Sequence, residues 1–355
     1  MREYLHGGDI YTQEIEMDYS ANISPLGLPA GVKEAVVNNL DSFCVYPDSR
    51  CIKLREALAE HHQVKADHII CGNGSADLIF QLTEALKPEK ALLTAPSFQE
   101  YEQALKAAGT KIRFCRLKEE QGFALDRKAW EEMLDDGIEM AFLCNPNNPT
   151  GIPILKEDVV HMAEECRKRG IFLAVDECFN EFLDEPEQYS VLKEEGEKDN
   201  VFILKAFTKL YAMAGFRLGY GICGNEDVLS AMEEKRQPWS VSGIAQAAGE
   251  AALRETAYVR QVRELAGRER KFLKHGLKQL GFQVFDSQAN YIFFHVPDDG
   301  TGEDSLFYRL KKEKILIRSC GNYPGLENGY YRICVKDREK DQKLLAIMEK
   351  VRHKR

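Results

Sequence analysis

Short apolar runs alternate with longer amphipathic stretches along the first two-thirds of the chain. The amphipathic stretches place apolar residues at helical spacing and predict helices, among them 31–40, 76–86, 98–108 and 156–169. The apolar runs predict buried strands, which we expect at 68–71, 91–94, 111–117, 140–144, 171–175, 201–204 and 218–222. Strands and helices that alternate this regularly imply crossover connections. We therefore predict an α/β fold with a mostly parallel sheet that helices cover on both faces.

The pattern changes after residue 257. A long, charged helical run at 258–280 predicts a helix that connects two domains. Beyond it we expect strands at 282–285, 291–295, 315–317 and 330–335, with helices around Leu306 and Leu344. We therefore predict a large domain at 31–257 and a smaller α+β domain at 258–355, which residues of the N-terminal arm join.

Residues 1–30 form this arm, which follows no period because glycine and proline interrupt it. His6, Tyr19 and Asn22 distinguish the arm from a plain polar tail. We expect an ordered arm that lies near a site, although a solvated terminal histidine is the simpler interpretation of His6 by itself.

Composition argues against several classes of protein. The net charge of -9 is unlike that of a general nucleic-acid or anionic-membrane surface. No apolar run approaches the ~18 residues of a membrane span. The first residues lack the apolar segment of a secretory signal, so we expect a cytoplasmic protein. The 10 cysteines include no Cys-x-x-Cys, so we expect neither a metal site nor disulfides and interpret them as buried apolar residues in a reducing compartment.

Glycine-rich and polar segments follow several of the predicted strands, and ligands of mostly parallel sheets bind at such carboxyl ends. The turn that contains Gly74, Ser75 and Ala76 leads from a strand into a helix. This geometry presents free backbone N–H groups to an anion. Turns of the same composition also serve as plain connections.

Lys209 and Asp176 also lie at strand ends. Lysine is rarely buried without a partner, so Lys209 is either a Schiff-base lysine that burial and nearby charge keep partly neutral or a surface lysine on a loop. Asp176 is expected to be buried, where a carboxylate needs a cationic partner or several donors. A protonated pyridine nitrogen is such a partner, whereas a helix cap or turn acid is the more common role of aspartate after a strand.

Other residues near these strand ends suit a phosphate or a flat ring. The planar guanidinium of Arg217 suits phosphate, and with Thr208 and the glycine-rich turn it would complete a phosphate-binding cup; a salt bridge is the alternative. The turn at 145–151 holds two prolines and a glycine, which leave Asn148 able to donate to a ring oxygen. Phe98 can stack on a flat ring or pack in the core.

Three motifs together resemble one known family. CNPNNPTG at 144–151, VDE at 175–177 and TK followed by AG-x-R-x-G at 208–219 match, in order and spacing, the fold-type I pyridoxal-phosphate enzymes of the aminotransferase class I/II group. The resemblance implies a large domain with a seven-stranded, mostly parallel sheet between helices, and a small α+β domain. It also implies bound pyridoxal 5′-phosphate and a homodimer.

The resemblance further implies roles for individual residues. Lys209 would form the Schiff base with the cofactor, Asp176 would pair with the pyridine nitrogen, and Asn148 would bind the ring hydroxyl. The remaining implied contacts are Phe98 with the ring, Gly74, Ser75, Ala76, Thr208 and Arg217 with the cofactor phosphate, Tyr46 with the phosphate bound by the partner subunit, and Arg332 with the substrate carboxylate.

Two positions depart from the family pattern. Phe179 stands where many relatives have a tyrosine, so one hydrogen bond to the ring oxygen is lost. Ala206 stands where many have serine or threonine, so a hydroxyl contact to the cofactor phosphate is in question, although cofactor binding is not.

Within this group, further segments resemble the enzymes that decarboxylate L-threonine O-3-phosphate in cobalamin synthesis, with the histidinol-phosphate aminotransferases as near relatives. These segments are HGGDIY at 6–11, DYSANISPLG at 18–27, YPD at 46–48, GNGSADLIF at 72–80, PWSV at 238–241 and ILIRSCGNYPGL at 315–326. The resemblance implies a pocket for a substrate phosphate. We assign His6, Asn22 and Arg318 to it, with Tyr323 as a further contact.

The resemblance leaves two reactions open. If the bond to the carboxylate stands perpendicular to the cofactor ring, CO2 leaves and a phosphorylated amino acid becomes an aminopropanol phosphate; this decarboxylation is our prediction. If the Cα–H bond stands there instead, Lys209 removes the proton and the enzyme transaminates. A non-catalytic cofactor-binding regulator would need a DNA-binding segment or a missing lysine, and the sequence shows neither.

Overall fold

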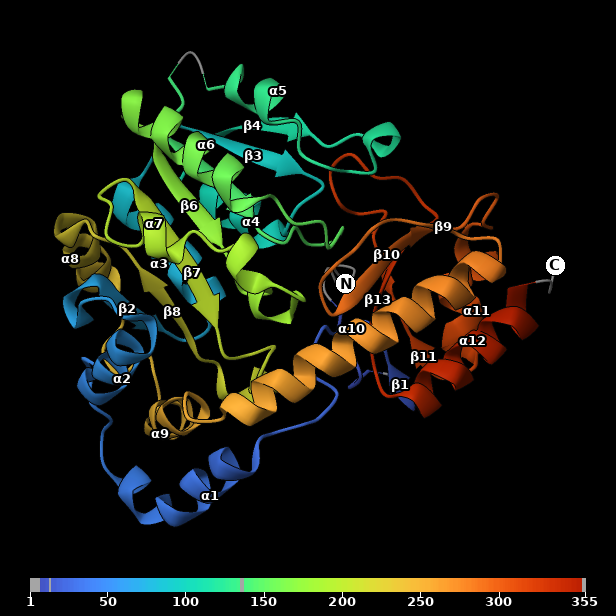
Figure 1. The fold of residues 1–355 in the computed structure, drawn as a ribbon, viewed down its shortest axis with the longest axis horizontal. Coiled ribbons are helices and arrows are strands. Elements are labelled where there is room, and N and C mark those ends of the chain that lie inside the picture. The colour runs from blue at the N-terminus through green and yellow to red at the C-terminus, as the bar shows by residue number, and fades with distance from the viewer. Residues whose placement is uncertain (1–6, 13, 135–136, 353–355) are drawn as a thin grey trace.

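The computed structural model describes residues 7–12, 14–134 and 137–352, and it confirms the predicted α/β class (Figure 1). Seven strands form one sheet in the order β2-β8-β7-β6-β5-β3-β4. Every neighbouring pair is parallel except those of β8, which runs antiparallel to β2 and β7. The strands are β2 (Ile69–Gly72), β3 (Lys90–Ala95), β4 (Lys111–Arg116), β5 (Met140–Cys144), β6 (Phe172–Asp176), β7 (Val201–Ala206) and β8 (Gly219–Ile222).

Helices cover both faces of this sheet (Figure 1). Alternate residues of a strand point to opposite faces, so Met140 and Phe142 of β5 enter one apolar core while Ala141 and Leu143 enter another. Both sides of the central strands are therefore buried, which explains their continuous apolar runs. The helices of this part are α1 (Ala30–Asn38), α2 (Ile52–His62), α3 (Ser75–Leu86), α4 (Gln99–Ala107), α5 (Arg127–Glu131), α6 (Lys156–Lys168), α7 (Leu192–Glu195), α8 (Glu226–Lys235) and α9 (Gly243–Ala252).

The C-terminal part builds a second, antiparallel sheet in the order β12-β13-β10-β9. The long helix α10 (Thr256–Gln279) runs from the first sheet to this one, as the charged helical run predicts (Figure 1). The limits of the two domains stay a prediction. The elements are β9 (Gln283–Val284), β10 (Tyr291–His295), β12 (Arg318–Ser319), β13 (Tyr330–Cys334), α11 (Leu306–Lys312) and α12 (Arg338–Arg352).

The arm is ordered over most of its length and joins the two parts. Its strand β1 (Met17–Asp18) pairs in parallel with β11 (Ile315–Leu316). The buried Tyr19 hydroxyl donates to Asp341 Oδ1 at 2.9 Å. Farther along, Ser24 N donates to the carbonyl oxygen of Lys209 at 2.9 Å. The arm thus reaches from α12 to the segment that holds the candidate lysine.

The prediction of one strand at 315–317 is wrong in detail. The chain forms β11 and β12 in succession, and these strands belong to different sheets, because β11 pairs with the arm and β12 pairs with β13. The partner of β11 lies almost the whole chain away, so the apolar run gives no sign of this change.

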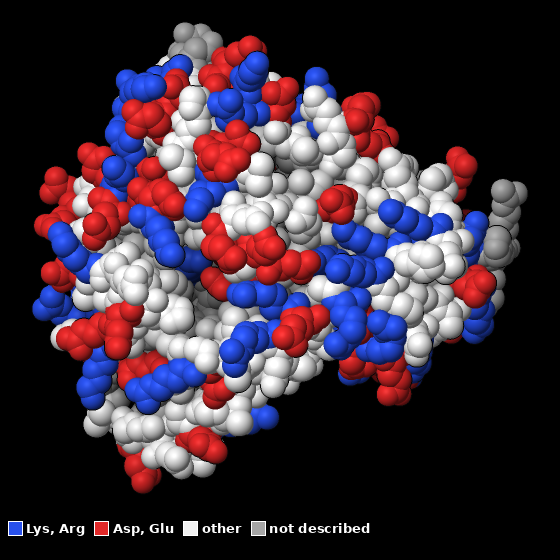
Figure 2. Space-filling view, in the orientation of Figure 1, with Lys and Arg blue, Asp and Glu red and all other residues white. Residues whose placement is uncertain are grey.

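Further features of the fold are its charged surface, its cysteines and the lengths of its helices. Acidic and basic side chains are intermixed over the face drawn in Figure 2. All 10 cysteines are free, and most are buried. Within the described part of the chain, no helix combines the length and the apolar character that crossing a bilayer requires.

Candidate active site

A cavity of about 250 Å³ lies where the carboxyl ends of the large sheet face the small sheet and the arm. β2, β5, β6 and β7 run in one direction, so the segments that follow them meet at one edge of the sheet. The cavity brings together most of the predicted site residues, namely Asn22, Ser75, Ala76, Phe98, Asn148, Asp176, Thr208, Lys209, Arg217, Arg318, Tyr323 and Arg332.

Asp176 is the buried acid of this cavity, with 6% of its surface exposed. Its carboxylate accepts hydrogen bonds from the Tyr101 hydroxyl at 2.6 Å and from Cys178 N at 2.9 Å. Burial raises the pKa of Asp176, and the two hydrogen bonds oppose that rise. No lysine or arginine of the described residues pairs with it, so the carboxylate is positioned for a cationic group that enters the cavity.

Lys209 follows β7 and points its amine into the same cavity. The amine has no hydrogen-bond or ion-pair partner among residues 7–12, 14–134 and 137–352. Burial lowers the pKa of Lys209, and the positive charges of Arg332 and Arg217 lower it further. A buried lysine that loses its proton readily is a nucleophile and a base.

The turn between β2 and α3 forms an anion-binding cup. α3 has Gly74 at its N-cap and no side-chain capping hydrogen bond, so its first N–H groups face the cavity. Gly74 has a φ of 83°, and a Cβ there would lie 2.4 Å from Arg217 Nη2. Gly219 makes a second close approach, since its Cβ would lie 2.5 Å from Ser75 N. The sequence motif contains Gly219, but its role as a neighbour of this turn emerges only in the fold.

Arg332 is a buried guanidinium on β13, with 6% of its surface exposed. It donates to Asn148 Oδ1 and, at 2.8 Å, to the carbonyl oxygen of Ser20, while its Nε has no partner in the described part of the chain. Both acceptors are neutral. A buried cation held only by neutral acceptors needs an anion for charge balance.

Arg318 lies directly opposite Arg332, as its Cα partner across β12 and β13. It is also buried, donates to Asn322 Oδ1 at 2.9 Å, and stacks on Tyr323 with the guanidinium carbon 5.1 Å from the ring centroid. Asn22, from the arm, is buried beside them with its Oδ1 unsatisfied in the described structure. Like charges that face each other across two strands repel, so the pair favours ligands with negative groups.

The asparagine side chains of the turn at 145–151 have two roles: some hold the turn together, and one lines the cavity. Asn145 donates to the carbonyl oxygens of Ile154 and Tyr189, both at 3.0 Å, so it holds the turn itself. Asn147 Nδ2 likewise donates to Pro96 O at 3.0 Å. Asn148 is the asparagine of this turn that lines the cavity, as the sequence predicts.

Several cavity residues escape the sequence analysis. Ser20, Glu100 and Cys178 line the cavity, and burial raises the pKa of Glu100 to about 7, with Lys209 and Arg318 opposing the rise. Tyr101, which holds Asp176, also went unpredicted. A glutamate and a tyrosine inside an amphipathic helix carry no signal in the sequence, because the rotation of α4 decides where they point.

The remaining positions that the sequence singles out are not all found in this cavity. Phe179 lines the cavity and packs against Tyr291, with ring centroids 5.1 Å apart. Ala206 lines a different cavity, so it stays outside the set of residues around the candidate site. Tyr46 is 78% exposed and stacks on Trp239 away from the cavity. His6 lies outside the described residues.

A family model and several known proteins resemble this chain. The family model for aminotransferase class I and II matches residues 14–348. The threonine-phosphate decarboxylase of Salmonella typhimurium is 35% identical over 355 residues, which cover 98% of this chain and 96% of the relative. The crystal structure of the histidinol-phosphate aminotransferase from Clostridium acetobutylicum is 32% identical with a TM-score of 0.88, and the match covers 94% of this chain and 98% of that one.

A third likeness concerns the fold alone. The histidinol-phosphate aminotransferase from Sinorhizobium meliloti, in complex with pyridoxal-5′-phosphate, is 22% identical with a TM-score of 0.86. This match covers 96% of this chain and 92% of that one.

The close approach of Gly219 to the α3 turn can be tested by Gly219→Ala. The added Cβ meets backbone atoms of Gly74 and Ser75, so α3 must move, and we expect a loss of about 1–3 kcal/mol in the free energy of unfolding. Binding of a phosphate group at the turn, measured by titration with inorganic phosphate, should weaken as well.

Gly215→Ala is the matched control for this test. Among the described residues, none lies within 4 Å of a Cβ added at Gly215, so we expect a change of no more than about 0.5 kcal/mol. Equal losses in the two variants, measured by denaturant unfolding, would show that the contact with Ser75 is unimportant.

Proposed function

Because the chain belongs to the aminotransferase class I and II family, we propose that it is a pyridoxal-phosphate enzyme that decarboxylates a phosphorylated amino acid, L-threonine O-3-phosphate, to an aminopropanol phosphate. The relative from Salmonella typhimurium is named a threonine-phosphate decarboxylase. The observation that carries the proposal is the facing pair Arg318 and Arg332, which suits a substrate with two negative groups.

The cavity fits pyridoxal phosphate by its charges. Asp176 is a buried carboxylate with no cationic partner in the described chain, which suits a protonated pyridine nitrogen. The free N–H groups of α3, together with Arg217 and Thr208, suit the phosphate. Phe98 lines the same cavity, where its ring can stack on the pyridine. When bound, the cofactor accepts the electron pair released as a bond to the substrate's Cα breaks.

Two residues of the chain orient the substrate in this proposal. Arg332 binds the α-carboxylate, since it is buried, fork-shaped and next to Asn148. Arg318 binds the substrate phosphate, with Asn22 and Tyr323 beside it. His6 remains assigned to the same pocket as a prediction. Held at both ends, the substrate cannot rotate freely, so the arginines decide which Cα bond stands perpendicular to the ring.

Lys209 moves the protons. Burial and the nearby arginines lower the pKa of its amine, so Nζ reaches the neutral form at lower pH than an ordinary lysine. No described residue holds this amine through a hydrogen bond or an ion pair. After CO2 leaves, the ammonium form of Lys209 donates a proton to Cα and becomes the neutral amine, and its lowered pKa favours this transfer.

An aminotransferase is the second candidate. The relative from Clostridium acetobutylicum, named as a histidinol-phosphate aminotransferase, is nearly as similar as the decarboxylase. The same residues support both reactions, because transamination follows if Lys209 removes the proton from Cα. Threonine phosphate and histidinol phosphate share an amine and a phosphate, whereas histidinol phosphate has no carboxylate for Arg332 to bind.

We also propose a homodimer in the cytoplasm. Tyr46 and Trp239 stack at 4.6 Å and are 78% and 49% exposed, with exposed Val37, Leu40 and Val45 in the same region of the chain. Exposed aromatic and aliphatic residues of this kind favour an interface. Ten free cysteines are consistent with a reducing compartment. Tyr46 would then extend toward the site of the partner subunit.

Decarboxylation is tested with threonine phosphate and no keto acid. We expect sustained CO2 release by the holoenzyme, and none from Lys209→Ala, which should also lose the visible absorbance of lysine-bound cofactor. A lack of CO2 together with steady turnover on addition of 2-oxoglutarate would identify an aminotransferase instead.

Arg318→Ala tests the substrate-phosphate contact. Losing a charge-assisted hydrogen bond of about 1.5–3 kcal/mol should raise KM for threonine phosphate at least about tenfold, while the affinity for pyridoxal phosphate stays the same. Arg318→Lys keeps the positive charge but lacks the planar guanidinium, so its KM for threonine phosphate should lie between those of the wild type and Arg318→Ala. Equal weakening of substrate and cofactor would remove Arg318 from the substrate pocket.

Trp239→Asp tests the interface. A charge in the apolar patch should convert a dimer to a monomer in sedimentation velocity. Tyr308→Asp, which changes an exposed aromatic of α11 that is 39% exposed, is the control and should remain dimeric. A wild-type protein that sediments as a monomer would contradict the homodimer.

A further inference from the structure

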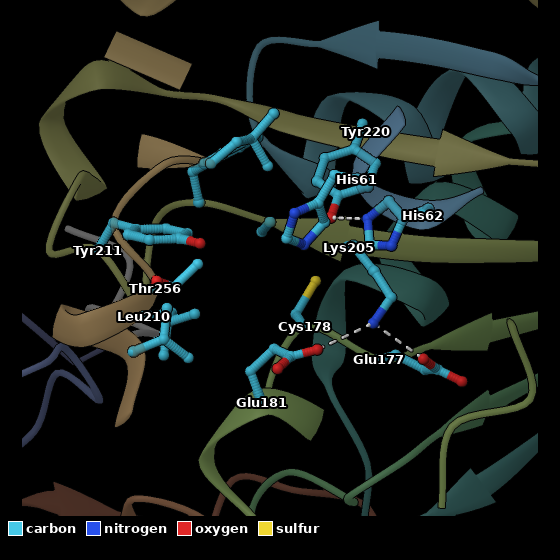
Figure 3. Close-up of a pocket in the computed structure, with 14 residues that line it drawn as sticks. His61, His62, Glu177, Cys178, Glu181, Lys205, Leu210, Tyr211, Tyr220 and Thr256 are labelled. Atoms are coloured by element: carbon cyan, nitrogen blue, oxygen red, sulfur yellow. Dashed lines mark hydrogen bonds and ion pairs between the residues drawn. The ribbon is translucent and has the colours of Figure 1, made fainter. Parts of the chain in front are cut away.

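A second cavity, of about 140 Å³, lies beside strand β7, which contributes Lys205 and Ala206 to its lining (Figure 3). Residues of α2, β7 and β8 and the start of α10 line it. Cys178 lines both cavities, so this residue stands between the second cavity and the candidate active site. None of the residues that we assign to cofactor or substrate is part of its lining.

The charges at the floor of the second cavity are already paired. Lys205 Nζ lies 3.1 Å from Glu177 Oε2 and 3.7 Å from Glu181 Oε1. Arg263 Nη2 lies 3.2 Å from Glu181 Oε2. Two cations therefore balance two carboxylates. A charged ligand would enter without a counter-ion of its own, and the cost of burying an unpaired charge argues against it.

Some polar groups of the lining make no hydrogen bond within the described structure, namely the Tyr211 hydroxyl, the Thr256 hydroxyl and the His61 ring; of these residues Tyr211 is the buried one. Tyr211 is buried, with 7% of its surface exposed. Its hydroxyl has no hydrogen-bond partner in the described structure. Figure 3 shows this hydroxyl directed inward, toward the side where His61 lies. A ligand with a complementary atom in this cavity would give the hydroxyl a hydrogen-bond partner.

A second tyrosine of the same cavity, Tyr220, differs from Tyr211 because its hydroxyl already has a hydrogen-bond partner. The Tyr220 hydroxyl lies 2.8 Å from His62 Nε2. Burial lowers the pKa of His62 to about 2, so this imidazole is neutral and its hydrogen bond with Tyr220 carries no charge. Tyr220 therefore offers a ligand an aromatic face without a free hydroxyl.

The size and walls of the cavity define what fits. A cavity of about 150 Å³ in another protein holds benzene, so this one has room for a single ring. Phe207 lies 5.6 Å from Tyr211 and 5.5 Å from Tyr220 by ring centroids, which makes one wall aromatic, while Leu210 and Val259 make apolar walls. Aromatic walls favour an aromatic guest through edge-to-face contacts.

We propose that this cavity binds an uncharged molecule with a single aromatic ring and one hydrogen-bonding substituent, which pairs with the Tyr211 hydroxyl. The site is separate from the proposed catalytic chemistry, so it stands or falls independently of the reaction that the enzyme performs.

Phenol is the probe, titrated into the pyridoxal-phosphate-loaded protein by calorimetry. We expect one-to-one saturable binding with a dissociation constant on the order of a millimolar or tighter. Cyclohexanol, which has the hydroxyl without the aromatic ring, should bind more weakly, and benzoate, which is charged, should not bind. Equal binding of all three would overturn the proposed ligand class.

Two tyrosine variants locate the hydrogen bond. Tyr211→Phe should weaken phenol about fivefold, the worth of one ordinary hydrogen bond. Tyr220→Phe, the matched control, removes a hydroxyl that His62 already occupies and should leave the phenol affinity unchanged. Equal effects of the two variants would overturn the assignment to Tyr211.

A filling variant locates the cavity. Val259 lines the second cavity and not the candidate active site, so Val259→Trp should abolish phenol binding. Phenol that binds Val259→Trp as tightly as the wild type would place the molecule elsewhere and overturn the proposal. The tyrosine pair decides the question if the tryptophan variant fails to fold.

Discussion

The unpaired buried charges of the candidate site are the constraint on which the rest of the structure depends. Burying an ion costs several kcal/mol unless a partner offsets it. Elsewhere the chain supplies such partners: Glu269, which is fully buried, contacts both Arg268 and Arg338. Among the described residues, Asp176 accepts hydrogen bonds only from neutral donors, and Arg332 donates only to neutral acceptors. The two groups are therefore suited to partners from outside the chain, a cation beside Asp176 and an anion beside Arg332.

The fold brings these charges together through three separate parts of the chain. Asp176 and Lys209 come from the carboxyl edge of the large sheet, and Arg332 comes from the small sheet. The arm connects them, because Ser24 N donates to Lys209 O while the carbonyl oxygen of Ser20 accepts from Arg332. Neither sheet alone contains a complete site, so the position of the arm matters as much as the motifs do.

Much of this arrangement could be predicted from the sequence, for physical reasons. Strands buried on both faces are apolar throughout, so β5, β6 and β7 were visible as runs, and the residues after them had to share one edge. The pairing of β1 with β11, two residues on each side, was invisible because its partners lie so far apart. The support of Asp176 by Tyr101 depends on how α4 is rotated, and the place of Ala206 beside the second cavity depends on the pleat of β7; neither leaves a mark in composition or periodicity.

Two lysines four residues apart show how the surroundings divide one segment into two kinds of site. Burial by itself would lower the pKa of Lys205, but Glu177 and Glu181 outweigh it and raise the pKa, so this lysine stays charged and structural. Lys209 is surrounded by Arg332 and Arg217 instead, and its pKa falls. Glu177, which directly follows β6, contributes to the difference because it raises the pKa of Lys205. Successive residues of a strand point to opposite sides, so Asp176 enters the cavity of Lys209 while Glu177 pairs with Lys205. One side of β7 is thereby left with charges that need a ligand, and the other with charges already satisfied, where only an uncharged guest is favoured.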